Sequence, residues 1–382
     1  ETLRITAQLI DISDGSHIWS ERWDRKLDDV FKIQDEISVK IVKKMKVSLG
    51  GKERALVTKR YTESTEAYNL YLRGRSYWHQ FSEYGYTRAI DFFKQGLKLD
   101  PDFALAYANI GYCCVFLGWY YFMDPAEAFA KSRETALTAL RMDEELSEAH
   151  AVLAMVSMVY DKDWKKAGKE FQRAISLNPG SSMAHIFYSF YLAAQQRHEE
   201  SIDAGKKGFS LDPVTFFPGI NLGVRYYYAR QYENALAAMQ SAVDLNPNVA
   251  ITPLYTGLPL IKLGRCEEAY TGIIKALKEI GRDHSELLCM LGITEVFRGN
   301  REAAMRVLDE LYALSETKQV SSAFIGIFCT VLEKFDEAVR WFEKGLERHD
   351  HLLIFLRVEP LLDNIQQDER FINIVKKVGL IE

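Results

Sequence analysis

The chain has 382 residues, of which 48% are hydrophobic and 26% charged, with a formal net charge of −5 and a pI near 6.0. This balance provides no basic surface of the kind that binds nucleic acid, and no apolar run approaches the roughly 18 residues of a membrane span. We therefore expect no nucleic-acid partner and no membrane span in this chain. A cytoplasmic location is the prediction, and a place in the extracytoplasmic part of a membrane-anchored protein stays open.

The first fifty residues predict a small α/β segment. Apolar and polar residues alternate from Leu3 to Leu9 and again from His17 to Trp23, with Asp14-Gly15 suited to a tight turn between them. This pattern is typical of a β-hairpin. Apolar residues then recur at helical spacing from Val30 onward. A hairpin followed by one helix is therefore predicted for 1–50, with a polar linker over 51–63.

A repeat of 34 residues organises the rest of the chain. Pro179, Pro213 and Pro247 stand 34 residues apart, and each ends a Leu-Asn-Pro or Leu-Asp-Pro phrase. Small residues keep the same register just before these prolines, at Ala174, Gly208, Ala242 and Ala276. That period is the signature of stacked helix-turn-helix units. Weaker copies on both sides, including one that ends at Pro101, bring the prediction to about eight units over 64–351.

These units resemble the tetratricopeptide repeat (TPR). The unit that ends at Pro247 carries Leu222-Gly223, Tyr226, Ala235 and Ala242 at that repeat's offsets. The resemblance implies a mostly α-helical superhelical solenoid, followed by capping helices over 352–382. It also implies a binding module without catalytic activity, whose ligand is a protein or a peptide.

The resemblance further indicates which residues face the concave groove of the solenoid. Carried onto this chain, the groove positions are mostly apolar and aromatic: Tyr68, Tyr71, Trp78, Tyr112, Phe116, Met155, Met158, Ile186, Phe190, Phe217, Ile220, Val224, Tyr227, Tyr228, Leu254 and Leu258. The Lys, Asn and Arg set with which chaperone-binding members hold a terminal carboxylate is missing. Two interpretations stay open: a peptide-binding groove with aromatic anchors, or a stripe covered by tight curvature or by the chain's own tail.

Residues 1–50 resemble the second half of the TolB amino-terminal-like domain, through Leu3–Asp11, Trp19–Asp24 and Asp29–Ile37. The tail, with Glu359-Pro360-Leu361-Leu362 and Asp368–Phe371, is similar to the closing segment of the arrays that follow this domain. In that family the array accompanies an adenylate cyclase, a Ser/Thr kinase or a winged-helix DNA-binding domain. We therefore expect such an effector before Glu1, and an edge in 1–50 able to pair two chains as a homodimer.

Residue patterns that carry chemistry are scarce. Gly50-Gly51-Lys52 lacks the spacing of a phosphate loop, and His349 and His351 are interpreted as a solvated turn rather than as metal ligands. We therefore predict no enzyme, no cofactor and no metal. The predicted function is a protein-interaction and sensing module of a bacterial signalling protein. The alternative is a regulatory C-terminal fragment of a cyclase, kinase or transcriptional regulator.

Overall fold

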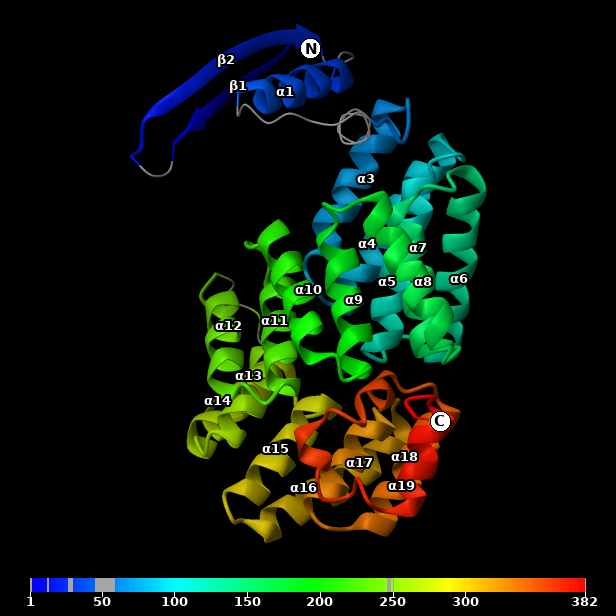
Figure 1. Ribbon diagram of the computed structural model, residues 1–382, viewed down its shortest axis with the longest axis vertical. Coiled ribbons are helices and arrows are strands. Elements are labelled where there is room, and N and C mark those ends of the chain that lie inside the picture. Colours follow the sequence, from blue (N-terminus) through cyan, green and yellow to red (C-terminus); the bar gives the residue numbers. More distant parts are fainter. Residues whose placement is uncertain are drawn as a thin grey trace.

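The computed structural model describes residues 2–11, 14–26, 30–44, 59–245, 249 and 251–381. The chain begins with two antiparallel strands, β1 (Thr2–Ile10) and β2 (His17–Lys26), followed by helix α1 (Val30–Lys44). The predicted hairpin and helix are thus both present, and Figure 1 shows them at one end of the molecule. Most of the predicted linker, from 51 to 58, lies outside the described residues.

The hairpin is held by its turn and by one covered face. Gly15 has a φ of +73°, a conformation that glycine adopts without a steric cost, and the Ser16 amide donates to Oδ1 of Asp14 over 2.8 Å. Trp19 and Trp23 lie edge to face at 5.8 Å. The ammonium of Lys40 in α1 lies 5.4 Å from the Trp23 ring centre, so that α1 shields this face of the sheet.

From residue 65 the chain forms eight antiparallel helix pairs, and no strand occurs among the described residues after β2 (Figure 1). The pairs are α3 (Thr65–Trp78) with α4 (Glu83–Leu99), α5 (Ala104–Trp119) with α6 (Pro125–Met142), α7 (Ser147–Val159) with α8 (Trp164–Leu177), α9 (Ser182–Ala194) with α10 (His198–Leu211), α11 (Phe216–Tyr228) with α12 (Tyr232–Leu245), α13 (Thr252–Lys262) with α14 (Cys266–Ile280), α15 (Ser285–Phe297) with α16 (Arg301–Thr317), and α17 (Ser322–Val331) with α18 (Phe335–Glu347). Pro101, Pro179 and Pro213 lie between pairs as predicted, and Pro247 falls outside the described residues.

The backbone repeats as regularly as the sequence. Within every pair, the turn contains one residue with a positive φ: Phe81, Tyr121, Lys162, Gln196, Arg230, Gly264, Gly299 and Glu333. From Gln196 to Gly264 these residues stand 34 apart. Residues other than glycine rarely adopt this conformation. Its return in each pair therefore shows that all eight turns follow one design.

Small residues occur where the helices of a pair meet. Ala174, Ala242 and Ala276 are at most 2% exposed, and a Cβ added to Gly208 would lie 2.7 Å from Cγ1 of Ile186. Larger side chains at these positions would separate the helices. From the second pair onward the first helix is the more buried one. In the third pair, α7 is buried on nearly all sides, whereas its partner α8 buries only a stripe formed by Ala167, Gly168, Phe171 and Ala174.

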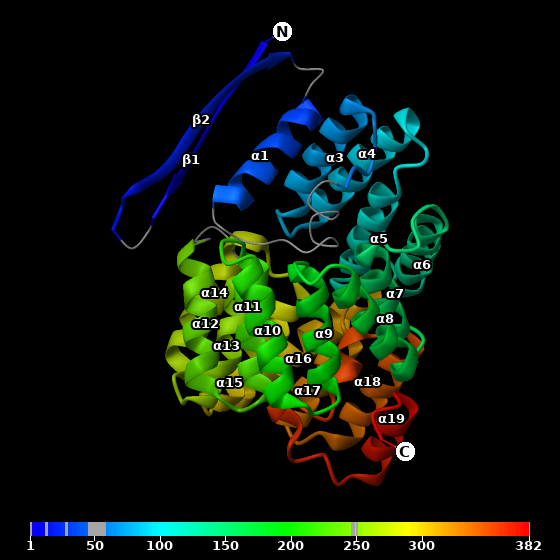
Figure 2. The same cartoon turned by 45° about the horizontal axis from the view of Figure 1, so that its top comes forward.

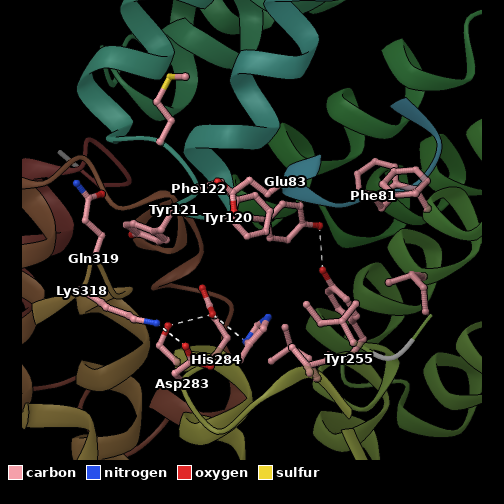
Figure 3. Close-up of a pocket in the computed structure, with 18 of the residues that line it drawn as sticks. Phe81, Glu83, Tyr120, Tyr121, Phe122, Tyr255, Asp283, His284, Lys318 and Gln319 are labelled. Carbon is pink, nitrogen blue, oxygen red and sulfur yellow. Dashed lines mark hydrogen bonds and ion pairs between the residues drawn. The ribbon is translucent and has the colours of Figure 1, made fainter. Parts of the chain in front are cut away.

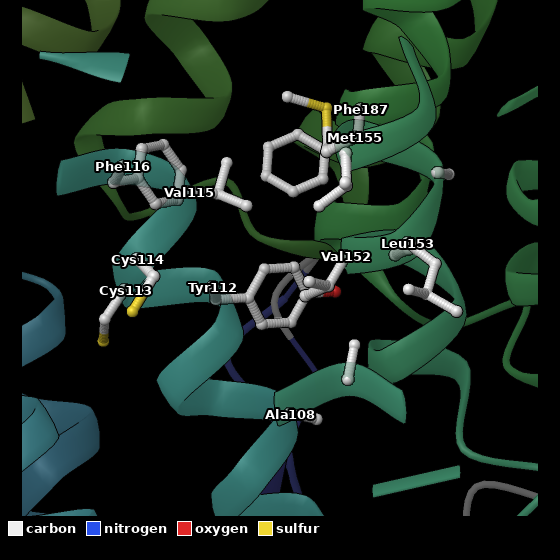
Figure 4. Packing of buried hydrophobic residues seen from close by; sticks show 14 of the residues in the cluster. Ala108, Tyr112, Cys113, Cys114, Val115, Phe116, Val152, Leu153, Met155 and Phe187 are labelled. Carbon is white, nitrogen blue, oxygen red and sulfur yellow. The ribbon is translucent and has the colours of Figure 1, made fainter. Parts of the chain in front are cut away.

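The inner helices from α3 to α11 share one hydrophobic core, and a second core runs from α13 to the last helix, α19 (Glu369–Lys377). Figure 4 shows Tyr112 and Phe116 of α5 facing Val152 and Met155 of α7 and Phe187 of α9. Rings from α5 and α9 approach to 5.8 Å between Tyr112 and Phe187. Four of the five cysteines are buried and all five are unpaired, as expected of reduced core residues.

The array curls so that the segment after α18 packs against α7 and α9, while α3 and α4 lie at the opposite end of the array from α19 (Figure 2). After α18 the chain continues through the short 3₁₀ helices η2 (His351–Phe355) and η3 (Pro360–Leu362) to helix α19 (Glu369–Lys377). The indole of Trp164, at the start of α8, donates a 2.8 Å hydrogen bond to the carbonyl of Val378. The C-terminal segment thus closes the superhelix onto its N-terminal half.

Candidate functional site

The structure buries most of the predicted groove residues. All of the sixteen except Tyr68, Val224 and Leu258 are less than a tenth exposed. Tyr227, Met155, Met158 and Ile186 have no exposed surface at all. These positions therefore do not wall an open groove, and peptide binding by them stays a prediction.

The chain's own C-terminal segment covers the middle of this surface. The hydroxyl of Tyr227 donates a 2.6 Å hydrogen bond to Oε1 of Glu359. The ring of Phe355 lies 4.9 Å from that of Tyr228 and 6.3 Å from that of Phe190. Apolar side chains of the tail thus occupy the position that a ligand would take in an open solenoid.

The interpretation of residues 349–351 as a solvated turn was wrong for His351. That side chain is only 7% exposed, and its ring lies against that of Trp119 with 4.2 Å between the ring centres. Burial lowers its pKa to about 4, so the ring is neutral at pH 7. The turn is buried because it lies where the C-terminal segment meets the end of α5.

The described residues line three cavities within the curve of the superhelix. The central cavity has a volume of about 570 Å³, the N-terminal cavity about 330 Å³, and the inner cavity about 130 Å³. Ten of the sixteen predicted residues line at least one of them: Tyr71, Trp78, Tyr112, Phe190, Phe217, Ile220, Val224, Tyr228, Leu254 and Leu258. The other six, Tyr68, Phe116, Met155, Met158, Ile186 and Tyr227, line none of the three.

The central cavity lies between the first two helix pairs and the pairs from α11 to α16. Figure 3 shows aromatic side chains from the turns after α3 and α5, among them Phe81 and Tyr121, opposite a polar group formed by Asp283, His284 and Lys318. Tyr120 and Tyr255 join the two sides through a hydrogen bond of 3.0 Å between their hydroxyls. The cavity therefore has an aromatic wall and a polar wall, brought together by residues more than 100 positions apart.

The polar wall carries more acid than base. Lys318 forms an ion pair with Asp283, and this hydrogen bond holds the pKa of Asp283 below its ordinary value. His284 lies 3.2 Å from a carboxylate oxygen of Glu286. Burial raises the pKa of Tyr120 to about 12, so its hydroxyl stays protonated. The wall can thus donate and accept hydrogen bonds, but its charge does not favour anions.

The N-terminal cavity is narrower and more polar. Tyr71 accepts hydrogen bonds from Nη1 of Arg75 at 3.3 Å and from Nδ2 of Asn109 at 3.5 Å. Glu148 lines the same cavity, and burial raises its pKa. The hydroxyl of Tyr112 is buried there without a hydrogen-bond partner among the described residues. Mixed polar groups of this kind suit the backbone of a bound segment.

Among the described residues, no cluster of three or more His, Cys, Asp or Glu side chains is suited to hold a metal ion. No helix in the described ranges is both long and apolar enough to cross a membrane. What the cavities offer is hydrogen bonding and apolar contact, which is the chemistry of recognition.

Sequence reasoning missed the residues that give the cavities their character, above all Tyr120, Tyr255, Lys318 and Arg225. One signal was present: Trp119 to Phe122 is a run of four aromatic residues that continues past the end of α5 into a turn. Aromatic residues in a turn need a surface to cover them. Nothing comparable marks Tyr255 or Lys318, whose place depends on how far the superhelix closes.

No family model matches the chain. The putative adenylate cyclase 3 of Rhizobium meliloti (strain 1021) is 37% identical over 108 residues, which are 28% of this chain and 18% of that protein. The transcriptional regulator HilA of Salmonella typhimurium is 24% identical over 174 residues, 45% of this chain and 31% of HilA. The similarity thus spans less than a third of either relative.

A solved structure of the human IFIT1 dimer with m7Gppp-AAAA resembles this fold. It matches 83% of this chain and 77% of that chain with a TM-score of 0.56 at 13% sequence identity, which supports the helical architecture alone. The eight helix pairs, their period of 34 residues and the small residues between the helices identify the chain by its fold as a TPR-repeat protein.

Proposed function

We propose that this chain is a protein-interaction and sensing module of a bacterial signalling protein, and that it holds an apolar or aromatic segment of a partner in the central cavity. The observation that carries the proposal is the cavity itself. Its volume of about 570 Å³ lies within the range of roughly 300 to 1,000 Å³ that is usual for ligand sites. Aromatic walls with a few polar groups provide anchoring and orientation.

The charge of the cavity favours a peptide over a nucleic acid. The IFIT1 structure contains a capped RNA, and phosphate chains need several cationic side chains. Here Glu83, Asp124, Asp283 and Glu286 line the central cavity together with only Lys318 and His284. We therefore propose a neutral or basic peptide segment and no RNA.

We further propose that the module regulates an effector within a larger signalling protein. The similarity to an adenylate cyclase and to a transcriptional regulator supports this proposal. So does the resemblance of residues 1–50 to a TolB amino-terminal-like segment. A ligand shifts such an effector only when it binds the two states of the solenoid with different affinities. The central cavity lies between the first two pairs and the pairs from α11 to α16, so its shape depends on how these pairs are placed.

The test starts from peptides selected from a displayed random library on the intact chain. Phe122 lines the central cavity and is 38% exposed, whereas Phe297 is 41% exposed and lies outside the three cavities. Phe122→Ala should weaken peptide binding by about 1 kcal/mol or more, and Phe297→Ala should leave it unchanged. Equal affinities for both variants, with both folded, would place the peptide site elsewhere.

A further inference from the structure

The inner cavity contains a buried arginine that forms no ion pair with any described residue. Arg225, in α11, is only 2% exposed, and its Nε and Nη1 atoms are buried with no hydrogen-bond partner among the described residues. Its guanidinium carbon lies 4.4 Å from the ring centre of Phe190 and 5.3 Å from that of Tyr228. A guanidinium presents five N–H donors and remains charged. Leaving such a group without a counter-ion inside a protein is strongly unfavourable.

The acidic residues of this cavity do not neutralise the guanidinium. Glu359 already accepts hydrogen bonds from the Tyr227 hydroxyl at 2.6 Å and from the Leu361 amide at 3.0 Å. Glu286 accepts from Ser285 at 3.0 Å and lies beside His284. Neither carboxylate forms an ion pair with Arg225 in the described structure. Burial lowers the pKa of Arg225 to about 10, which leaves it protonated at neutral pH.

The space around Arg225 suits a small planar molecule. The inner cavity measures about 130 Å³, close to the ~150 Å³ of an apolar cavity known to accept benzene. Aromatic rings dominate its walls, including Phe190, Tyr228 and Phe355. It shares Tyr120, Leu254 and Tyr255 with the central cavity, so the two cavities are adjacent.

We propose that the inner cavity binds a small free monocarboxylate with a planar apolar body. Its carboxylate accepts hydrogen bonds from Arg225, and its apolar body lies among the aromatic rings. One guanidinium can pair with the single negative charge of a carboxylate, whereas a phosphate ester carries more negative charge than this one cation offsets. This site goes beyond the proposed function because it is separate from the anchor of the partner segment and takes a different class of ligand.

The experiment compares benzoate with its uncharged analogue benzamide on the intact chain, by calorimetry and by the shift in melting temperature. Benzoate should bind the unmodified chain, and benzamide should bind far more weakly. Arg225→Met should weaken benzoate binding by at least about 30-fold, because one partner of a buried charge pair is removed. Arg197, which forms an exposed ion pair with Glu200, provides the matched control: Arg197→Met should bind benzoate like the unmodified chain.

Separate measurements test whether the Arg225 variants fold. Without ligand, Arg225→Met should be at least as stable as the unmodified chain, since it removes an unpaired buried charge. Arg225→Lys keeps the charge but loses the planar fork, so it should fold and bind benzoate about tenfold more weakly. Selected peptides that contact Phe122 should bind Arg225→Met unchanged, which separates this site from the peptide site.

Two results would overturn the proposal. One is the absence of benzoate binding to the unmodified chain, or equal binding to Arg225→Met. The other is that the unmodified chain binds an acetylated tripeptide ending in phenylalanine but does not bind benzoate, and that Arg225→Met does not bind the tripeptide. The cavity would then hold the C-terminus of a peptide.

Discussion

Tyr227 and Glu359 stand 132 positions apart, yet the hydroxyl of one donates a 2.6 Å hydrogen bond to the carboxylate of the other inside the superhelix. Tyr227 is a buried residue of α11, and Glu359 is the N-cap residue of the short helix η3 in the C-terminal segment. The bond therefore joins the inner surface of the solenoid to the segment that covers it. This hydrogen bond helps to hold the array closed.

Removing this hydroxyl should loosen the closure. Tyr227→Phe keeps the ring but removes the hydrogen bond to the buried carboxyl of Glu359. The free energy of unfolding should therefore fall by about 1 to 3 kcal/mol. The matched change Tyr84→Phe, at a ring that is 62% exposed, should stay within about 0.5 kcal/mol. Urea unfolding followed by circular dichroism measures both. Equal stability of the two variants would mean that the bond does not hold the tail.

The same carboxyl predicts a pH dependence. Burial raises the pKa of Glu359 from its ordinary 4.5 to about 6, so the folded state favours the protonated form. Its contribution to stability is complete below pH 4.5 and is lost as the pH rises through 6. Glu359→Gln stays neutral at every pH and keeps an acceptor for Tyr227. The free energy of unfolding of Glu359→Gln minus that of the unmodified chain should therefore rise by about 2 kcal/mol between pH 4 and pH 7.

Comparing the two proteins at each pH isolates this effect. Burial lowers the pKa of His351 to about 4, which gives the opposite trend: that contribution is present above the ordinary value of 6.5 and is lost as the pH falls through 4. Both proteins contain His351, so its effect cancels in the difference between them. A difference that stays constant with pH would show that Glu359 titrates alike in the folded and unfolded chain.

The fold could be predicted from the sequence because each repeat contacts its neighbours at fixed spacings. The close approach of Ile186 requires a glycine at position 208, and both residues lie within one 34-residue unit. The site could not be predicted in the same way. Whether Tyr228 faces solvent or Phe355 depends on the small rotation between each helix pair and the next, added over many pairs. No local sequence pattern indicates the total rotation. Arg225 lies one residue from the repeat position Tyr226, and nothing beside it in sequence indicates that it is buried.

The positive φ in each turn gives a direct test of the repeat design. Gly264 has a φ of +74° with open space around it, whereas Gly272 lies inside α14 with its nearest neighbour, Pro253, 3.5 Å from an added Cβ. Gly264→Ala should cost about 1 kcal/mol because only the backbone conformation resists the methyl group. Gly272→Ala should raise stability by about 0.5 to 1 kcal/mol through helix propensity. A gain from Gly264→Ala in urea unfolding would contradict the left-handed turn.

The last prediction concerns the hairpin. Its two strands form a sheet of their own, so the outer edge of each is unpaired within the described residues. Ile10 and Ile18 are about half exposed, on the face opposite the tryptophans. We predict that two copies pair through this hairpin, because a two-stranded sheet is marginal in water.

Light scattering should give the mass of two chains for the unmodified protein, and Ile18→Lys should give that of one, since a charge on an edge strand blocks pairing. The control Val214→Lys places the same charge at a side chain that is 68% exposed, between α10 and α11, and should leave the dimer intact. An unmodified chain that is monomeric at the same concentration would show that the edges of the hairpin stay unpaired. A dimer that survives Ile18→Lys would instead place the contact on the solenoid, where the remaining exposed apolar residues, such as Leu72 and Leu245, are the next positions to substitute.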